Sequence, residues 1–307
     1  HILKDFKEMK DGKSINRGEL LMKDLELIAD IELVEELIKP KKELTQKNYY
    51  LSYSVLLQTD SKNYQAEIDY YTKKARFIQE KYETEVNKQM KTPSQSANWV
   101  SIEELQIILE KEFEIIEKMN LLDKPTIKKA EYKVVQSWFI GSLYVADPID
   151  HPPVRVDYAP MDIIQKNIYD KIEANSPEEK TNYLVLDGQK PLQFHFGDYK
   201  TFRTYGVQVN KISKIMKPII EFYLNIHNKF TDDNTLLLNR MFKPLTENGL
   251  TKAIPTIFKS TGKNITITLL RHIVISEQVP ARNKKEKDIA KKMLHSRKMQ
   301  SDYSKIV

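Results

Sequence analysis

Residues 267–276 read Ile-Thr-Leu-Leu-Arg-His-Ile-Val-Ile-Ser, an apolar stretch that carries an arginine and a histidine side by side at positions 271 and 272. Its apolar spacing predicts a helix from Thr266 to Ser276. Two short pieces follow, Met-Leu-His-Ser at 293–296 and then Tyr303, close to the last residue. This set of arginine, histidine and tyrosine side chains is the part of the sequence most specific for a function.

The positive charge of the chain gathers around the same residues. Residues 251–307 hold 13 basic and 4 acidic side chains, a net charge of +9, whereas the whole chain of 307 residues carries +6. Such a basic end suggests a polyanionic partner that is met by one face. A solvated, lysine-rich helix or tail would give the same count, so charge alone leaves both interpretations open.

Composition and missing motifs exclude several classes of protein. The chain has no cysteine, which excludes a disulfide scaffold and a zinc site built on thiolates. It has no apolar stretch long enough to cross a bilayer and no signal segment, so we expect an intracellular protein without a membrane partner. A glycine-rich phosphate loop, a dinucleotide fingerprint, histidines at metal-ligand spacing and a Gly-x-Ser-x-Gly elbow are all missing, which favours chemistry without a metal or cofactor.

The first third of the chain predicts a small helical bundle. Shorter apolar stripes lie in 20–38 and 44–58, and a long one runs from about Gln65 to Met90 through Ile68, Tyr71, Ala75, Ile78, Tyr82 and Val86. Residues 91–98, Lys-Thr-Pro-Ser-Gln-Ser-Ala-Asn, break this period and predict a linker. We therefore expect a helical domain at 1–90, a linker at 91–98 and a second domain at 99–307.

The second domain is expected to add a small antiparallel sheet, so that the fold class is mainly α (α+β). Ser101 and Glu104 form a capping box at a helix start, and Pro125 suits the first turn of a helix that runs to Ala146. Alternating apolar residues predict strands at 183–186 and 192–196 around an Asp-Gly turn, and a third strand at 202–205. Helical spacing returns at 209–226, where Pro218 predicts a kink or a shifted start, and further helices are expected at 250–260 and 285–295.

Two more informative pieces lie upstream of the quoted stretch. Residues 151–158 read His-Pro-Pro-Val-Arg-Val-Asp-Tyr, with Arg155 in a Pro-Pro-x-Arg pattern, and residues 196–201 read Phe-Gly-Asp-Tyr-Lys-Thr, with Lys200 directly after the predicted hairpin. Together with the Arg-His pair, the Met-Leu-His-Ser turn and Tyr303, these five boxes in order resemble those of the tyrosine recombinases, the phage-integrase-like family. The Pro-Pro-x-Arg form is typical of members from large eukaryotic DNA viruses and related mobile elements. The resemblance covers about residues 99–307, and the first third is similar to the family's core-binding domain only in its helical character.

The resemblance implies a site-specific recombinase or integrase that cuts and rejoins DNA strands through a covalent 3′-phosphotyrosyl intermediate. Tyr303 would be the nucleophile, Arg155 and Arg271 would hold the phosphate, and Lys200 would be the general acid. His295 would bind the phosphate or assist the tyrosine proton. Two guanidinium groups suit the phosphorane-like transition state because their charge is fixed and their donors are forked. The scheme needs neither a metal nor a cofactor.

Three further residues are expected to make phosphate or supporting contacts: Thr268, His272 and Asp157. Thr268 stands three residues before the second arginine, where the family usually has histidine, and its hydroxyl can hydrogen-bond but cannot act as an acid or base at neutral pH. Leu294 stands where the family usually has glycine. Outside the joint pattern, Arg155 could simply form an ion pair with Asp157, Lys200 could be solvated, and His272 is expected to be structural.

The resemblance also implies the partners. Double-stranded DNA is expected to lie between the two domains, and self-association into a dimer on a site and a tetramer in synapsis is implied. No small-molecule substrate is expected. The phosphates flanking the cut would be neutralised by a set of basic residues, which makes binding fall steeply with salt: Lys252, Lys259, Lys263, Lys284, Lys285, Lys291 and Lys292.

Two other functions fit the same residues. A type IB topoisomerase-like enzyme would share the catalytic side chains but relax supercoils as a monomer without site preference. A DNA-binding protein on a degenerate recombinase fold would also explain Thr268 and Leu294. A protein of this kind would act in a host nucleus or a viral replication compartment, or in the cytoplasm of a cell without a nucleus.

Overall fold

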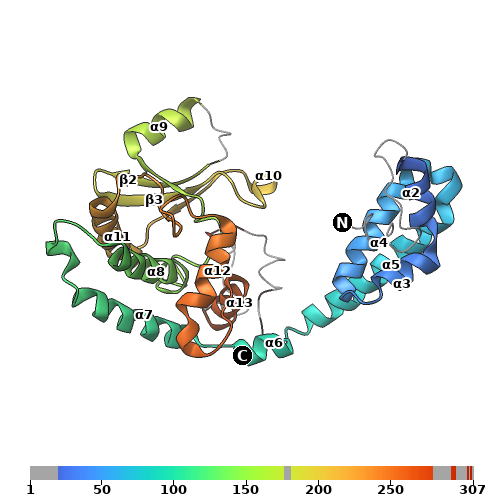
Figure 1. Ribbon diagram of the computed structural model, residues 1–307, viewed down its shortest axis with the longest axis horizontal. Coiled ribbons are helices and arrows are strands. Elements are labelled where there is room, and N and C mark those ends of the chain that lie inside the picture. Colours follow the sequence, from blue (N-terminus) through green and yellow to red (C-terminus); the bar gives the residue numbers. More distant parts are fainter. Residues whose placement is uncertain (1–19, 176–180, 279–291, 295–302, 304, 306–307) are drawn as a thin grey trace. The chain divides into compact units, whose positions relative to one another are not determined.

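The computed structural model describes residues 20–175, 181–278, 292–294, 303 and 305 (Figure 1). The chain divides into two compact units, residues 1–88 and 89–307, and each is described by itself. The described part is mainly helical with one small sheet, which confirms the predicted fold class. No helix in these described ranges is both long enough and apolar enough to span a membrane.

The first unit is built from tyrosine-rich helices. They are α2 (Leu20–Ala29), α3 (Ile31–Ile38), α4 (Glu43–Leu57), the 3₁₀ turn η1 (Gln58–Asp60) and α5 (Ser61–Asn87). Tyr50, Tyr53 and Tyr71 are buried where α4 packs on α5, and the ring of Tyr71 lies 5.8 Å from that of Tyr50 and 5.9 Å from that of Tyr53. The hydroxyl of Tyr71 donates to the carbonyl of Ile28 at 2.7 Å, which ties α5 to α2. A tyrosine of the aromatic core therefore also makes a hydrogen bond between two helices.

The long helix of the first unit differs from the prediction at its end. Ile68, Tyr71, Ala75 and Ile78 are buried as the stripe predicts, but Tyr82 is exposed. The reason is length: α5 has 27 residues, whereas its partner α4 has 15, so the last turns of α5 extend past the helix that covers it.

The segment predicted as a linker contains a short helix, α6 (Pro93–Asn98), and lies within the second unit. Thr92 and Gln95 form a capping box, and Pro93 occupies the first helical position, where its missing N–H costs nothing. The single proline and the small polar residues of 91–98 thus begin a short helix.

The second unit has helices on the predicted stretches, with shifted starts. They are α7 (Ile102–Glu117), η2 (Leu121–Asp123), α8 (Lys129–Val145), α11 (Met216–Phe230), α12 (Glu247–Ile257), η3 (Lys259–Thr261) and α13 (Ile267–Gln278). Ser101 accepts a hydrogen bond from the N–H of Glu104, which is one half of the predicted capping box. Pro125 lies before α8 rather than in its first turn, because the helix begins only after Lys128. The helix predicted at 285–295 lies outside the described residues except for 292–294.

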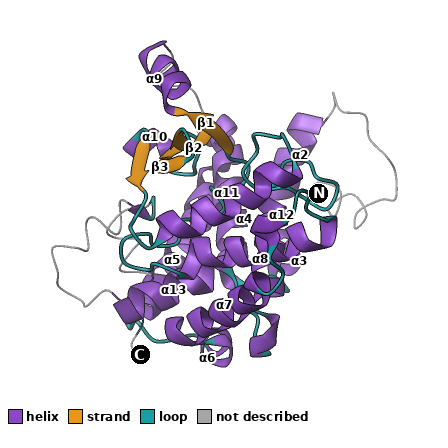
Figure 2. Ribbon diagram, turned by 90° about the vertical axis from the view of Figure 1, so that its left-hand side faces the viewer, coloured by secondary structure: helices purple, strands orange, loops and turns teal. Residues whose placement is uncertain are grey.

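The sheet is mixed rather than antiparallel. Its order is β1 (Asp162–Gln165), β2 (Asn182–Asp187), β3 (Lys190–Phe196) and β4 (Gln208–Lys211). Strand β1 runs parallel to β2, and α9 (Lys166–Asn175) lies in the connection between them. The predicted hairpin is present as β2 and β3, which pair antiparallel. Figure 2 shows β1, β2 and β3 side by side among the predominating helices.

The predicted third strand at 202–205 is wrong. These residues form a single helical turn, α10 (Phe202–Tyr205), which ends at Gly206 with a φ of +60°. The strand that pairs with β3 is β4, at residues 208–211, where helical spacing was expected to begin. Helix α11 starts only at Met216, so Pro218 falls in its first turn and shifts the start rather than making a kink.

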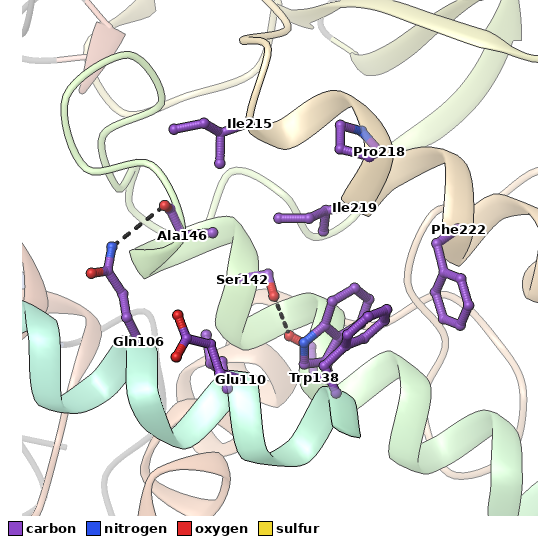
Figure 3. A pocket seen from close by; sticks show the side chains of 11 residues that line it. Gln106, Glu110, Trp138, Ser142, Ala146, Ile215, Pro218, Ile219 and Phe222 are labelled. Carbon is purple, nitrogen blue, oxygen red and sulfur yellow. Dashed lines mark hydrogen bonds between the residues drawn. The ribbon is translucent and has the colours of Figure 1, made fainter. Parts of the chain in front are cut away.

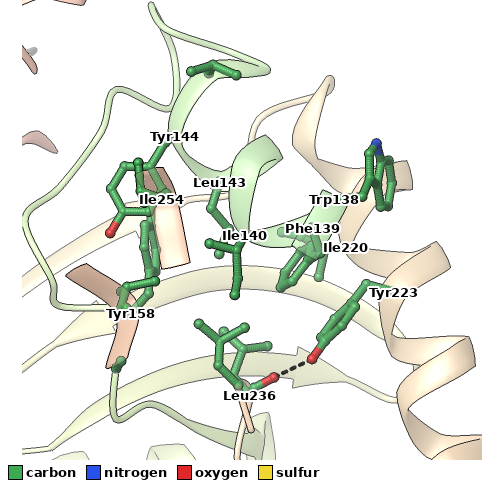
Figure 4. Packing of buried hydrophobic residues seen from close by; sticks show 14 of the residues in the cluster. Trp138, Phe139, Ile140, Leu143, Tyr144, Tyr158, Ile220, Tyr223, Leu236 and Ile254 are labelled. Carbon is green, nitrogen blue, oxygen red and sulfur yellow. Dashed lines mark hydrogen bonds between the residues drawn. The ribbon is translucent and has the colours of Figure 1, made fainter. Parts of the chain in front are cut away.

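The two faces of the sheet are covered by different helices (Figure 1). Tyr183 and Val185 of β2 pack with residues of α9, whereas Leu184 and Leu186 join the main core with α8 and α11. Figure 4 shows part of that core, in which Phe139 of α8 stacks on Tyr223 of α11 at 3.9 Å. The hydroxyl of Tyr223 donates to the carbonyl of Leu236 at 2.7 Å, so the buried ring leaves no polar atom unpaired.

Candidate functional site

Helix α13 places Arg271 inside the second unit. The hydroxyl of Thr266 accepts from the N–H of Leu269 at 3.1 Å and thereby caps the start of the helix. Arg271 is only 1% exposed. Its Nη1 donates to the carbonyl of Pro153 at 2.8 Å and its Nη2 to the carbonyl of Met293 at 3.2 Å, while Nε has no hydrogen-bond partner among the described residues. One guanidinium thus joins three segments that are far apart in the sequence.

Tyr303 lies against this arginine. Its ring centroid is 5.0 Å from Cζ of Arg271 and 4.7 Å from the ring of His272, and the side chain is 8% exposed. Ile275 of α13 and Met293 complete the contact. Arg271, from the Arg-His pair, and Tyr303 are therefore in direct contact.

His272 holds the backbone of Tyr303. Its Nδ1 lies 2.9 Å from the carbonyl oxygen of Tyr303, and because a carbonyl only accepts, Nδ1 carries the proton. Burial lowers the pKa of His272 to about 4, so the ring is neutral at physiological pH. One turn further along α13, the Ser276 hydroxyl accepts from the N–H of Lys305 at 2.8 Å. Two main-chain groups are thus bound to one face of the helix.

Arg155 and Asp157 do not form the surface ion pair that was the alternative interpretation, since no side-chain salt bridge joins them within the described ranges. Instead, the Asp157 carboxylate accepts from the main-chain N–H of Arg155 at 3.1 Å, and the Arg155 carbonyl accepts from the hydroxyl of Tyr144 at 2.6 Å. The side chain of Arg155 is partly exposed while its backbone is fixed. The loop is therefore held without using the guanidinium.

The charges of this loop act on Arg271. Burial raises the pKa of Asp157 to about 6, and the positive charges of Arg271 and Arg155 oppose this rise. Burial lowers the pKa of Arg271, the Tyr303 side chain opposes this through its charge interaction and a hydrogen bond, and the charge of Arg155 lowers the pKa further. The carboxylate is thus ionised at neutral pH, and the two arginines with this one aspartate leave a local charge of +1 beside Tyr303. Such a site favours an anion.

The turn at 292–294 is held by three consecutive carbonyls. The carbonyl of Lys292 accepts from Asn210 of β4 at 3.0 Å, that of Met293 from Arg271, and that of Leu294 from the Thr201 hydroxyl at 2.9 Å. Leu294 has a φ of +58°, a left-handed conformation that favours glycine. Leu294 therefore holds a backbone shape that a glycine would adopt without strain.

Lys200 lies in the turn between β3 and α10, next to Thr201, and its side chain is exposed. Asn182 shapes this turn: its Oδ1 accepts from the N–H groups of Gly197 and Asp198, and its Nδ2 donates to the carbonyls of Asp198 and Asp157. Asn182 thus connects the turn that carries Lys200 to the loop that contains Arg155 and Asp157, and Thr201 connects it to the 292–294 turn. Asn182 and Asn210 were missed by the sequence analysis, because nothing marks an asparagine in a strand as a hydrogen-bonding hub.

The remaining predicted site residues are placed as follows. Thr268 is exposed on the first turn of α13, three residues before Arg271. Lys252 and Lys259 are exposed, whereas Lys263 donates its ammonium to the Trp99 carbonyl at 2.6 Å and so has a structural contact. Lys292 lies 3.5 Å from the carboxylate of Asp150. The other predicted residues lie outside the described ranges: Lys284, Lys285, Lys291 and His295.

Two histidines without a predicted role prove to be structural. His151 is buried, and its Nε2 lies 2.6 Å from the hydroxyl of Tyr158. This buried contact stabilises the loop that contains Arg155. His227 is buried in α11, and its Nδ1 lies 2.8 Å from the hydroxyl of Tyr132. In the described ranges no group of three or more His, Asp or Glu side chains is arranged to hold a metal ion.

A separate cavity of about 470 Å³ opens between α7, α8 and the start of α11 (Figure 3). It is mostly apolar, with Trp138 and Phe222 on its wall and Glu110 at its side, and the Ser142 hydroxyl donates to the Trp138 carbonyl at 2.9 Å. None of the sequence-predicted site residues lines it.

Comparison of the chain with models of known protein families, with curated proteins and with solved structures finds no match. The interpretation of the site therefore rests on its residues and their geometry.

Proposed function

We propose that this protein cuts and rejoins DNA strands through a covalent tyrosine intermediate, as a site-specific recombinase of the tyrosine type does. The observation that carries the proposal is the contact of Tyr303 with Arg271, in the electrostatic neighbourhood of Arg155. These residues come from three distant parts of the chain. A phenol in contact with one guanidinium, whose pKa a second guanidinium affects, is a suitable arrangement for attack on a phosphodiester.

The chemistry is a reversible transfer of a phosphoryl group. The phenol oxygen of Tyr303 attacks phosphorus, the bond from phosphorus to the 5′ oxygen breaks, and a 3′-phosphotyrosyl link and a free 5′ hydroxyl result. The phenol proton leaves to a base, for which His295 is the candidate, and Lys200 supplies a proton to the departing oxygen. Attack of a 5′ hydroxyl on the link reverses these steps, so that rejoining needs no external energy source.

The arginines would stabilise the negative charge that develops on the non-bridging oxygens. Arg155 is suited to this role because its backbone is fixed by Asp157 and Tyr144 while its side chain is partly exposed. Thr268 lies on the face of α13 that carries Arg271, since residues three apart are neighbours on a helix, and its exposed hydroxyl can donate to a phosphate oxygen.

Duplex DNA is the proposed partner, and assembly of several subunits on it belongs to the same proposal. The exposed Lys252 and Lys259 support phosphate binding from α12 and η3. Affinity for duplex DNA should therefore fall with rising salt concentration.

The test is covalent trapping. Duplexes of randomised sequence carry one 5′-bridging phosphorothiolate, whose thiol leaving group departs without a general acid and rejoins poorly. The protein should form an SDS-resistant adduct that Tyr303→Phe abolishes. The matched control is Tyr205→Phe, because Tyr205 is exposed and does not belong to the Tyr303 cluster. The control should form adduct at the wild-type rate.

Two more variants assign the other roles. Arg155→Ala should abolish the adduct and leave most of the duplex affinity. Lys200→Ala should slow adduct formation about 100-fold or more on an ordinary phosphodiester and recover on the phosphorothiolate, because a thiolate needs no proton to leave. An adduct that persists in Tyr303→Phe contradicts the proposed nucleophile.

The trapped DNA also separates the alternatives. Enrichment of one sequence among the adducts supports a recombinase, whereas adducts without sequence preference, together with relaxation of supercoiled plasmid, indicate the topoisomerase-like enzyme. Salt-sensitive binding without any adduct indicates the DNA-binding protein.

A further inference from the structure

Arg271 is closed off on every side that the described residues reach. It is 1% exposed, both of its Nη atoms donate to main-chain carbonyls, and the ring of Tyr303 lies over the guanidinium. Among the described residues, Nε–H of Arg271 has no hydrogen-bond acceptor. A phosphate oxygen can use this donor only if the guanidinium is uncovered.

The ring of Tyr303 is held in place from α13. The backbone of Tyr303 is bound by His272 and that of Lys305 by Ser276, while Ile275 and Met293 pack on the ring. These contacts fix the main chain at Tyr303 and at Lys305 and keep the ring over the guanidinium.

Tyr303 contacts Arg271 through its ring and through a side-chain hydrogen bond, and a phosphate oxygen would replace both with a stronger contact because it carries a negative charge. A cation over an aromatic ring gains a modest attraction, whereas a charge-assisted hydrogen bond to phosphate also neutralises the buried charge. The unpaired Nε–H strengthens this preference, because a buried donor without an acceptor is costly. A phosphate delivered to the site can therefore displace the ring.

We propose that Tyr303 covers Arg271 in the free protein, so that a phosphodiester reaches this guanidinium only by displacing the phenol ring. The identity of the anion rests on the proposed function, but the cover itself does not. In this arrangement the Tyr303 ring leaves Arg271 when the DNA phosphate binds to the guanidinium. The ring also keeps small anions away from Arg271 until DNA is bound.

The cover is tested without DNA by arginine labelling. A vicinal dicarbonyl reagent and mass spectrometry report the reaction rate of each arginine in two variants that both lack the phenol nucleophile, Tyr303→Phe and Tyr303→Ala. Arg271 should be protected in the phenylalanine variant, which keeps the ring, and labelled several-fold faster in the alanine variant. Arg155 serves as the internal reference. Equal labelling of Arg271 in both variants overturns the proposal.

Binding to duplex DNA provides the second measurement on the same pair. Uncovering one more cation should steepen the slope of log affinity against log salt by about 0.9 in Tyr303→Ala relative to Tyr303→Phe. Equal slopes in two folded variants that bind DNA contradict the proposal. Failure of all variants to bind DNA counts against the proposed function instead, and the labelling result then decides the cover by itself.

Discussion

Leu294 occupies a backbone conformation that its side chain opposes. Its φ of +58° costs a non-glycine residue about 1–2 kcal/mol, yet the side chain is buried in the main core. The carbonyl of the same residue accepts the Thr201 hydrogen bond, so the conformation cannot relax without breaking that contact. Packing therefore compensates for strain at a single position.

The strain at Leu294 predicts that glycine destabilises the protein less than alanine does at this position, which is the reverse of the usual order. Leu294→Ala should destabilise the second unit by about 2–5 kcal/mol, because it removes the buried side chain and keeps the strain. Leu294→Gly should be more stable than Leu294→Ala by about 1 kcal/mol, although glycine is ordinarily the worse of the two. Urea unfolding followed by tryptophan fluorescence measures both variants, since Trp99 and Trp138 belong to the second unit. A more stable alanine variant would contradict the strain at Leu294.

His151 predicts how stability responds to acid. Burial lowers its pKa to about 4 in the folded protein, below the usual value of 6.5. The unfolded chain therefore binds more protons between these values, and stability is lost as the pH falls through this window. From neutral pH to about pH 5 the loss from this residue should be on the order of 2 kcal/mol.

The matched variant for this prediction is His151→Gln, whose amide can keep the Tyr158 partner and does not titrate. Urea unfolding at several pH values should show a shallower loss of stability for the variant than for the wild type. Parallel curves would show that His151 does not titrate as its burial indicates.

At the scale of elements, α13 connects the start of the second unit to the candidate site. Glu277, near its end, accepts from the indole N–H of Trp99 at 3.2 Å and from the N–H of Ile102, the first residue of α7, at 3.0 Å. His272 and Ser276 on the same helix hold Tyr303 and Lys305. One helix thus fixes the beginning of the unit and its terminal residues.

Glu277→Ala should destabilise the second unit by about 1–3 kcal/mol, because it leaves two partly buried N–H donors unpaired. It should also shift the emission of Trp99. The control is Glu117→Ala, at the exposed end of α7, where a change within about 0.5 kcal/mol is expected. Equal effects of the two substitutions in urea unfolding would contradict the role of Glu277.

The elements also show where sequence patterns succeed. Long apolar stripes, such as those of α5, α7 and α11, predict helices because apolar residues at helical spacing form one face that packs on the core. Residues 202–211 fail, because the aromatic residues of α10 resemble a strand while β4 is too short to show a period. Strand β1 was missed for the same reason, and with it the parallel pairing that makes the sheet mixed.

At the scale of the molecule, the candidate site gathers residues from positions 155, 271, 293 and 303. The sequence could suggest Arg155, Arg271 and Tyr303 because the order of the boxes is informative. It could not suggest Asn182, Asn210 or Thr201, because their roles are bonds to main-chain carbonyls and amides that exist only once the chain has folded. The burial of Arg271 was equally hidden, since no sequence pattern tells a covered guanidinium from an open one.

The three carbonyls of the 292–294 turn, together with that of Pro153, bear on how such a protein can change over evolution. Every residue type supplies the same carbonyl, so these four positions can exchange side chains without losing an acceptor. The geometry is then inherited through a few donors, chiefly Arg271, Thr201 and Asn210. Distant relatives should therefore be recognised by the spacing of these donors and by apolar residues at 293 and 294, whose side chains are buried, rather than by overall identity.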